Sequence, residues 1–141
     1  MPVIGWRTDR LPAFHTPDSD FAVDVRIDEV AEIARVMQAH WTLGWHGGLV
    51  VANPIAPQFA LPRTEIDTAI AQALADAQAR GIAGKALTPF LLQALNLRTE
   101  GRSLAANIEL VLSNARLAAS IAVAHASLGR PTLEPATSRR A

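Results

Sequence analysis

The 141-residue sequence lacks cysteine and has only one lysine, Lys85. Without cysteine, a disulfide scaffold and thiol chemistry are excluded, and the absence is typical of a cytoplasmic protein. A Schiff base formed within this sequence would have to use Lys85. The loop position before Thr88 favours an exposed structural lysine instead.

An excess of charge and a long apolar run are also absent. Thirteen basic residues balance thirteen acidic ones, so nothing indicates binding to nucleic acid or to an anionic membrane surface. The first ten residues, MPVIGWRTDR, lack the apolar core of a signal peptide. In the most apolar stretch, near the C-terminus, polar residues argue against a transmembrane span. They are Asn107, Glu109, Asn114 and Arg116.

The pattern along the chain predicts an α/β fold with roughly three strands and four helices, forming part of an α/β/α sandwich. Half of the residues are apolar, which suits one domain with a real core. Strands are predicted at 2–6, at 21–27 by its two-residue alternation, and at 49–52 as a run buried on both faces. Residues 1–128 are predicted to form the domain, and the Pro- and Ser-containing residues 129–141 a disordered tail.

Four residues are expected to cap helix starts. Asp28 precedes an apolar stripe that ends near Trp41, and Thr64 with Asp67 resembles a capping box. Thr88 precedes Pro89, which suits the first helical position, and Ser103 would cap the last helix. These positions predict the beginnings of all four helices.

The stretch 85–126 is the element around which the chain is predicted to be organised. It consists of two helices separated by the polar break 98–102, and the second helix is long, about 25 residues, and mostly apolar. Such a helix is expected to be buried among other elements. Asn107 and Asn114 lie seven positions apart, so they share roughly one face. Either each amide satisfies buried backbone groups, or Asn107 offers a donor and an acceptor to a polar ligand.

The histidines do not form a recognisable catalytic or metal-binding motif. His40 and His46 flank the end of a helix and could be brought together by a turn, but their spacing is not that of a metal site. His15 lies near Asp18 and Ser19, yet closeness in sequence has little force for a nucleophilic set. Spacing alone therefore gives a domain and one candidate polar position, without a complete active site.

Four segments, in this order, resemble the C-terminal part of the pseudouridine-5'-phosphate glycosidase family. They are PVIGWRTDRLPAF, GGLVVANPI, GKALTPFLL and GRSLAANIELVLSNARLAASIAVA. The resemblance implies an α/β/α enzyme, trimeric and dependent on a divalent metal, usually manganese. Such enzymes reversibly cleave the C–C glycosidic bond of pseudouridine 5'-phosphate to uracil and ribose 5-phosphate. A lysine Schiff base would supply the electron sink, with a carboxylic acid as proton donor.

The resemblance also implies which functional residues to expect here. Asn107, in SLAANI, matches a family asparagine at the active site and is expected to bind substrate against the uracil. The family's Schiff-base lysine, acid, metal ligand and most phosphate contacts lie upstream of the PVIG strand, so no catalytic or metal-binding residue is expected in this chain. Lys85 matches a different lysine. His15 stands where tyrosine is usual, and Asp20 where glycine is usual.

Three expectations follow from this resemblance. The chain is expected to be inactive alone, as a gene fragment, a product of a misplaced start codon or one half of a split enzyme. Its partners would be the small-molecule substrate, without nucleic acid or membrane, and either further copies of itself or the missing N-terminal half. The alternative is a non-catalytic binding or assembly module that uses its apolar helices as an interface.

Overall fold

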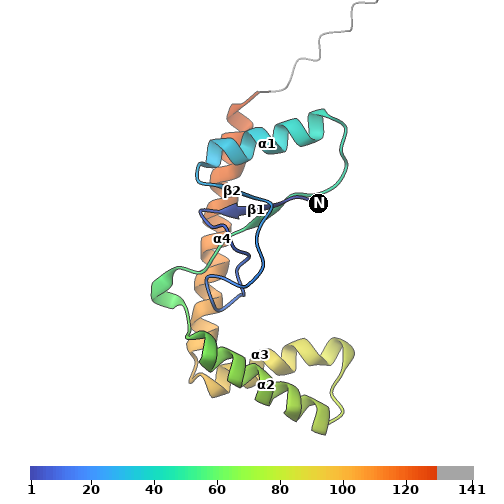
Figure 1. Ribbon diagram of the computed structural model, residues 1–141, viewed down its shortest axis with the longest axis vertical. Helices are drawn as coiled ribbons and strands as arrows, with labels where there is room; N and C mark the ends of the chain where they lie inside the picture. The colour runs from blue at the N-terminus through green and yellow to red at the C-terminus, as the bar shows by residue number, and fades with distance from the viewer. Residues whose placement is uncertain (130–141) are drawn as a thin grey trace, which may run out of the picture.

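The computed structural model describes residues 1–129 and has the predicted α/β architecture (Figure 1). In chain order the elements are β1 (Val3–Trp6), β2 (Val25–Ile27), α1 (Val30–Thr42), β3 (Val50–Ala52), α2 (Arg63–Ala79), α3 (Leu87–Arg98) and α4 (Arg102–Ser127). Short 3₁₀ helices cover Pro57–Phe59 and Gly84–Ala86. The predicted class of three strands and four helices is confirmed for the described residues. Apart from Gly129, the predicted tail 129–141 lies outside them.

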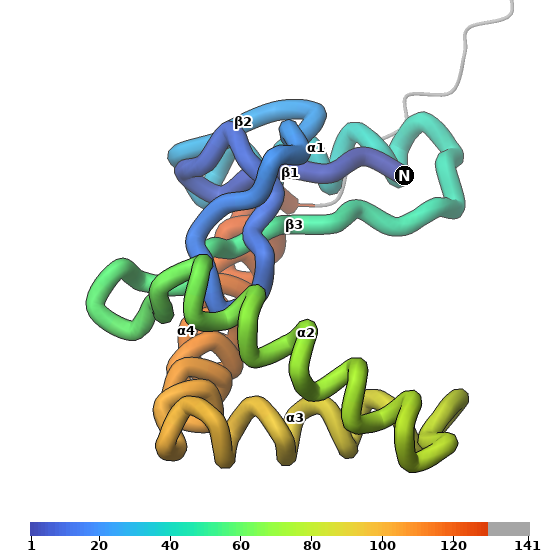
Figure 2. The backbone as a smooth tube through the Cα atoms, turned by 60° about the horizontal axis from the view of Figure 1, so that its bottom comes forward, coloured from blue at the N-terminus to red at the C-terminus, as the bar shows by residue number. Residues whose placement is uncertain are grey.

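The three strands form a parallel sheet in the order β2-β1-β3 (Figure 2). The strand predicted at 21–27 is wrong over its first half, because β2 begins only at Val25. Upstream, Ala22 forms an isolated antiparallel bridge with Arg10. The Asp24 carboxylate then accepts a 2.8 Å hydrogen bond from the Val3 backbone N–H. The alternating pattern in that segment therefore reflects a loop that folds back beside β1 rather than a longer strand.

One face of the sheet packs against α1 and α4. The central cluster joins Ile4 of β1, Ile27 of β2, Ile33 of α1 and Ile121 of α4, all buried. Figure 1 shows that α4 runs the length of the molecule, with α1 and the sheet beside its C-terminal half and the α2–α3 pair at its other end. A second buried cluster of Ile55, Ala106 and Leu110 lies farther toward the start of α4. The long helix therefore connects the sheet layer to the α2–α3 pair.

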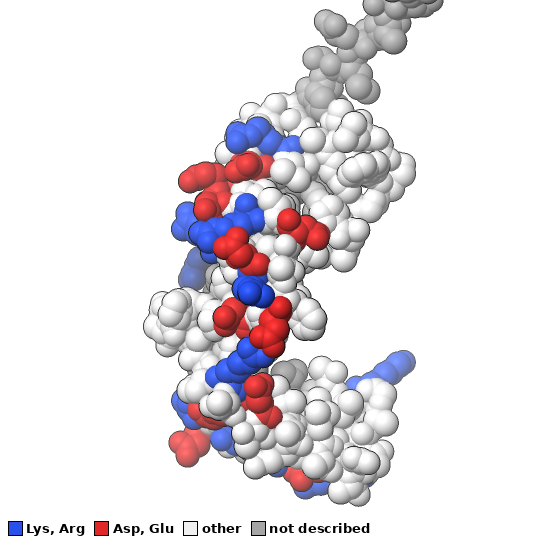
Figure 3. Space-filling view, viewed as in Figure 1, with Lys and Arg blue, Asp and Glu red and all other residues white. Residues whose placement is uncertain are grey.

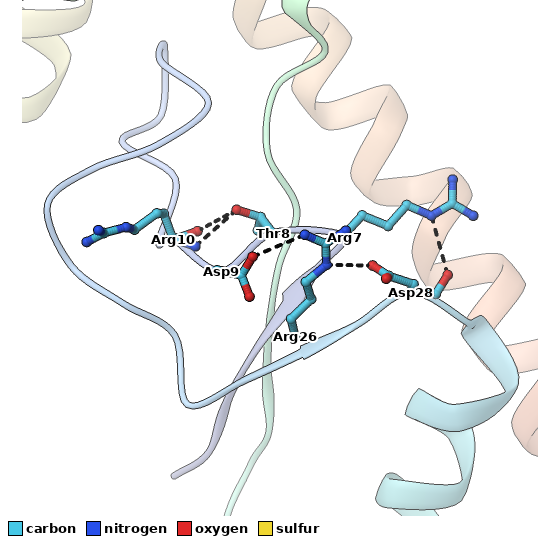
Figure 4. A network of polar contacts seen from close by, with 6 residues as sticks. All are labelled: Arg7, Thr8, Asp9, Arg10, Arg26 and Asp28. Carbon is cyan, nitrogen blue, oxygen red and sulfur yellow. Dashed lines mark hydrogen bonds and ion pairs between the residues drawn. The ribbon is translucent and has the colours of Figure 1, made fainter.

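A loop between β1 and β2 lies over the opposite face of the sheet. Arg26 of β2 binds the Asp9 carboxylate at 3.1 Å and the Asp28 carboxylate at 2.9 Å, and Arg7 donates to the Asp28 carbonyl at 3.3 Å (Figure 4). The two ion pairs of Arg26 are exposed, so solvent screens them and each contributes little to stability. Together they fix the start of the loop at the carboxyl end of the strands, from where it continues to His15.

The four predicted caps do not cap their helices. Residues flanking the helix starts are Glu29, Pro62, Ala86 and Gly101, none with a side-chain capping bond. Helices α2, α3 and α4 each begin one residue before the predicted capping hydroxyl, which places Thr64, Thr88 and Ser103 inside the helix. Asp28 instead pairs with Arg26. The predicted capping residues therefore lie within two residues of the helix starts, but their side chains do not cap them.

Thr99, rather than Ser103, supplies the side-chain hydroxyl that accepts a hydrogen bond from a backbone N–H at the start of α4. Its side chain is 0% exposed, and its Oγ1 accepts a 3.0 Å hydrogen bond from the Ser103 N–H while donating at 2.8 Å to the Leu95 carbonyl. One hydroxyl thus satisfies a free N–H of α4 and bonds the last turn of α3.

Replacing Thr99 with valine is expected to lower the free energy of unfolding by about 1–3 kcal/mol, because the shape is kept while the Ser103 N–H is left unpaired in a buried site. Urea unfolding followed by circular dichroism measures this loss. The matched control is Thr68→Val, whose exposed hydroxyl bonds only within its own helix. Equal unfolding midpoints for the two variants would contradict the capping role.

The expectation that the last helix is buried is wrong for much of its length. Helix α4 has 26 residues, of which only Ser103, Ala106, Leu110 and Ile121 are buried. Five of its large apolar side chains are between 42% and 69% exposed: Leu104, Ile108, Val111, Leu112 and Val123. Within residues 1–129, no helix has both the length and the apolar character needed to cross a bilayer. The other described residues therefore leave much of the apolar surface of α4 uncovered.

Candidate functional site

Asn107 lines a cavity of about 230 Å³ between α3, the first turns of α4 and the β1–β2 loop. Its wall is formed by His15, Leu92, Gln93, Asn96, Ser103, Leu104 and Asn107. Polar side chains thus come from three separate segments, and two leucines add apolar surface. Lys, Arg, Asp and Glu are absent from this lining set, so His15 is its only ionisable residue.

Backbone contacts fix His15 at this cavity. The His15 carbonyl accepts a 3.0 Å hydrogen bond from the Leu61 N–H, and Ala13 donates to the Thr16 carbonyl at 3.2 Å in a tight turn. The His15 ring stacks edge-on against Phe14 with centroids 4.6 Å apart. The residue is only 3% exposed. A loop histidine is therefore held inside the protein, against the α3–α4 junction.

Two residues of this cavity carry buried polar atoms without a hydrogen-bond partner. Over the described range these atoms are His15 Nδ1 and Asn96 Oδ1. An unpaired buried polar atom costs about 1–3 kcal/mol, so native proteins tolerate few of them. Both residues line the same cavity, although the two unpaired atoms themselves are enclosed, and this cavity is therefore our candidate functional site within residues 1–129.

Burial lowers the pKa of His15 below its ordinary value of 6.5, because the charged imidazolium loses its hydration. The ring is therefore neutral at physiological pH. A neutral imidazole has one N–H donor and one acceptor nitrogen. His15 can thus bind an uncharged polar group without introducing a net charge into the cavity.

The two asparagines of α4, Asn107 and Asn114, have different surroundings. Asn107 is half-buried, and its side chain has no hydrogen bond to any described residue. Asn114 is exposed and accepts a 2.9 Å hydrogen bond from Asn53. Neither amide satisfies a buried backbone group, so that first interpretation is wrong within residues 1–129. A free donor and acceptor on Asn107 suit a polar ligand, and its role as a ligand contact stays a prediction.

The other sequence candidates lie elsewhere and do not converge. Lys85 is exposed in the Gly84–Ala86 turn. His40 bonds the Gly47 carbonyl at 2.8 Å, whereas His46 is exposed. In the part of the chain that the structure describes, no three His, Asp or Glu side chains gather closely enough to hold a metal ion.

The nucleophilic set considered around His15 does not form. Ser19 uses its hydroxyl to accept a hydrogen bond from the Phe21 N–H at 3.3 Å. Asp18 is exposed, whereas His15 is buried with its Nδ1 unpaired. His15 instead belongs to the cavity of Asn107, a placement that sequence proximity did not indicate.

A second, larger cavity of about 480 Å³ lies between α1, β3 and α4. It is lined by Met37, Trp41, Leu49, Val51, Asn53, Asn114, Leu117, Ala118, Ile121 and Ala122. Val50 and Val51 of β3 are only half-buried, so the prediction of a strand buried on both faces is wrong within the described residues. Figure 3 shows charged side chains gathered along one flank, with few over the C-terminal half of α1. This apolar hollow was not predicted from the sequence.

The sequence profile of a known family, described as "Indigoidine synthase A like protein", matches residues 1–124. Similar curated proteins include the pseudouridine-5'-phosphate glycosidase of Caldanaerobacter subterraneus subsp. tengcongensis, 52% identical over 123 residues, covering 87% of this chain and 40% of the relative. The enzyme of the same name from Escherichia coli K12 is 52% identical over 122 residues, covering 86% of this chain and 39% of that protein. The chain thus spans about 40% of the length of these relatives.

Solved structures agree with these sequence matches. A prealnumycin C-glycosynthase, crystallised with ribulose 5-phosphate, superposes with a TM-score of 0.82 at 36% identity, covering 91% of this chain and 42% of that one. An indigoidine synthase A-like protein from Thermotoga maritima gives a TM-score of 0.76 at 33% identity, covering 87% of this chain and 40% of that one. The fold described above is therefore a recurrent portion of larger proteins.

Proposed function

Because the chain belongs to the family of indigoidine synthase A-like proteins, we propose that it supplies part of a pseudouridine-5'-phosphate glycosidase. The reaction is the reversible cleavage of the C–C glycosidic bond of pseudouridine 5'-phosphate to uracil and ribose 5-phosphate. The observation that carries this proposal is the 52% identity to a protein of that name over 123 residues. The C-glycosynthase similarity supports it through a related bond type.

The proposal assigns the covalent chemistry to the part of the family domain that this chain does not match. There, by resemblance, a lysine forms a Schiff base with the opened ribose and a carboxylic acid donates the proton. Manganese binding is assigned to that same unmatched part of the family domain. The residues described here do not fit a metal site, since no suitable ligand cluster exists among them, and no metal-dependent step is given to this chain.

We assign Asn107 a substrate-binding role against the uracil. Its amide can donate to a carbonyl and accept from a ring N–H, and no described residue already occupies it. The lining of the cavity has no Lys or Arg, and the Ser103 N–H at the start of α4 is already bonded to Thr99 Oγ1, so the cavity suits a neutral base better than a phosphate.

The assembly and location of the protein belong to the same proposal. By family resemblance it acts in the cytoplasm, either as part of a trimer or together with a polypeptide carrying the remaining part of the domain. The exposed apolar side chains of α4 support association of one of these kinds.

Release of uracil from pseudouridine 5'-phosphate in the presence of manganese tests the proposal. The full chain is assayed alone and mixed with the part of the Caldanaerobacter relative that lies outside the matched 123 residues. We expect turnover only in the mixture. A mixture that forms a complex yet releases no uracil would refute the proposed function.

Within an active mixture, Asn107→Ala is expected to reduce kcat/KM by about tenfold to a hundredfold, the effect of leaving polar groups of the ligand unpaired. Ser120→Ala is the control, because Ser120 is an exposed residue of the same helix that bonds only to Arg116. If both variants turn over like the unmodified chain, Asn107 does not contact the substrate.

A second candidate function is a non-catalytic assembly module. The exposed apolar residues of α4 and the 480 Å³ cavity favour it. It predicts self-association of the chain at micromolar concentration with no uracil binding. Sedimentation velocity together with the cleavage assay separates it from the enzymatic proposal.

A further inference from the structure

We infer that His15 and Asn96 act with Asn107 as specificity-determining contacts to the uncharged heterocyclic part of the ligand. This inference rests on the proposed function and extends it to two residues. All three side chains line the 230 Å³ cavity, and they come from the β1–β2 loop, α3 and α4. The cavity therefore has a polar contact set supplied by three independently anchored segments.

The polar groups that line the cavity indicate which part of a nucleotide, the phosphate or the base, can bind there. Its lining has amide, imidazole and hydroxyl groups but no Lys, Arg, Asp or Glu. A phosphate group would enter without a cation to neutralise it, at the cost of its hydration. A neutral planar ring loses less hydration and can lie against Leu92 and Leu104. The heterocyclic base is thus the part of the substrate that fits.

The surroundings of His15 decide where its single ring proton lies. Nδ1 is enclosed without a partner, and burial keeps the ring neutral by lowering its pKa. A proton on Nδ1 would leave a buried N–H unpaired, which is rarer in proteins than an unpaired acceptor. This difference favours the tautomer with the proton on Nε2. From there, His15 can donate a hydrogen bond to a carbonyl oxygen of the ring.

Asn96 complements this donor from α3. Its Oδ1 is the enclosed and unpaired end of the amide, so Nδ2 is the end available to a ligand, again as a donor. Asn107 adds both a donor and an acceptor. A ring with two carbonyl groups and adjacent N–H groups, such as uracil, matches this set. A ring without the carbonyls would leave the donors of His15 and Asn96 unpaired, and such sites discriminate strongly.

The test is uracil binding to the full chain, followed by NMR of ¹⁵N-labelled imidazole and side-chain amide groups. We expect saturable shifts of His15 Nε2 and of the Asn96 and Asn107 amides, with no competition from ribose 5-phosphate. His15→Phe should weaken binding by about tenfold to a hundredfold through loss of one buried hydrogen bond. His15→Gln, which keeps a side-chain N–H donor, should recover part of the affinity, and His46→Phe should change nothing, because His46 is exposed outside this cavity.

The outcomes are separable from those of the cleavage assay. Shifts that fail to saturate, competition by ribose 5-phosphate, or equal uracil affinity of His15→Phe and the unmodified chain would each overturn the inference. If His15→Phe loses binding but also shows an altered circular dichroism spectrum, misfolding explains the loss. Uracil affinity is then measured for His15→Gln and Asn96→Leu, and affinities equal to that of the unmodified chain would overturn the inference. Uracil binding through His15 in a mixture that never cleaves the substrate would leave this inference standing while the proposed function fails.

Discussion

Replacing Gly5 with alanine is expected to prevent the sheet from forming in its present arrangement. A Cβ at this position of β1 would lie 2.0 Å from the Thr8 carbonyl oxygen and 2.9 Å from Val23 Cγ2. The Thr8 oxygen belongs to the backbone of a loop held by hydrogen bonds at both ends, from Arg7 to Ile27 and from Leu11 to Phe21. The clash cannot be relieved by a rotamer change, and the loop over the sheet would have to move.

We expect a loss of at least about 3 kcal/mol, the upper end for overpacked sites. That loss is a large fraction of the roughly 5–15 kcal/mol that stabilises a typical domain. Urea unfolding followed by circular dichroism measures it. Gly47→Ala is the matched control, since its Cβ would meet no atom within 4 Å and its backbone is not in the left-handed region. Similar midpoints for the two variants would show that the β1–β2 loop is not fixed against Gly5.

The hydrophobic patterns predicted the elements better than their ends. The apolar run 2–6 and the apolar stripe that ends near Trp41 were sufficient to place β1 and α1. Each helix begins within two residues of its predicted cap, which is the usual uncertainty of a helix boundary, but none of the four predicted side chains makes a capping bond. Thr99 shows why: it was part of a polar break in the sequence, but it became the buried hydroxyl that joins α3 to α4.

Of the residues that line the candidate site, only Asn107 was predicted from the sequence, because its position in the helix was itself unusual. Asn107 interrupts an apolar helix near its N-terminus, which distinguishes it without knowledge of the fold. His15 gave no such signal, because its buried state depends on the Leu61 hydrogen bond and on α3, both distant in sequence. Asn96 is one polar residue among several on a helix and becomes notable only when its Oδ1 is found enclosed.

The surface of α4 shows a different limit of sequence analysis. A mostly apolar helix with small residues on much of its surface predicted burial, yet the rest of the described chain covers only part of α4. The 480 Å³ cavity lies beside β3, which pairs only with β1 among the described strands. An unpaired strand edge next to an apolar hollow is a favourable place for further sheet and helix to pack. The relatives, of which this chain spans about 40%, contain additional polypeptide that could occupy it.

Ala118→Arg is therefore expected to abolish the activity of the mixture described above. Ala118 is exposed and lines the cavity with Trp41 and Leu117. If the remaining part of the family domain packs there, the arginine becomes a buried and unpaired charge that costs about 3–5 kcal/mol. That cost corresponds to more than about a hundredfold weaker association.

Titration of the complementary polypeptide, read by uracil release and by sedimentation, measures the effect. Ala119→Arg is the matched control, because Ala119 is an exposed neighbour on α4 that does not line the cavity. It adds the same charge and the same side chain to the same helix, so any general effect on α4 appears in both variants. Equal activity of the two mixtures would mean that the additional polypeptide packs elsewhere, whereas a loss confined to Ala118→Arg identifies the α1–β3–α4 hollow as the surface that binds the additional polypeptide.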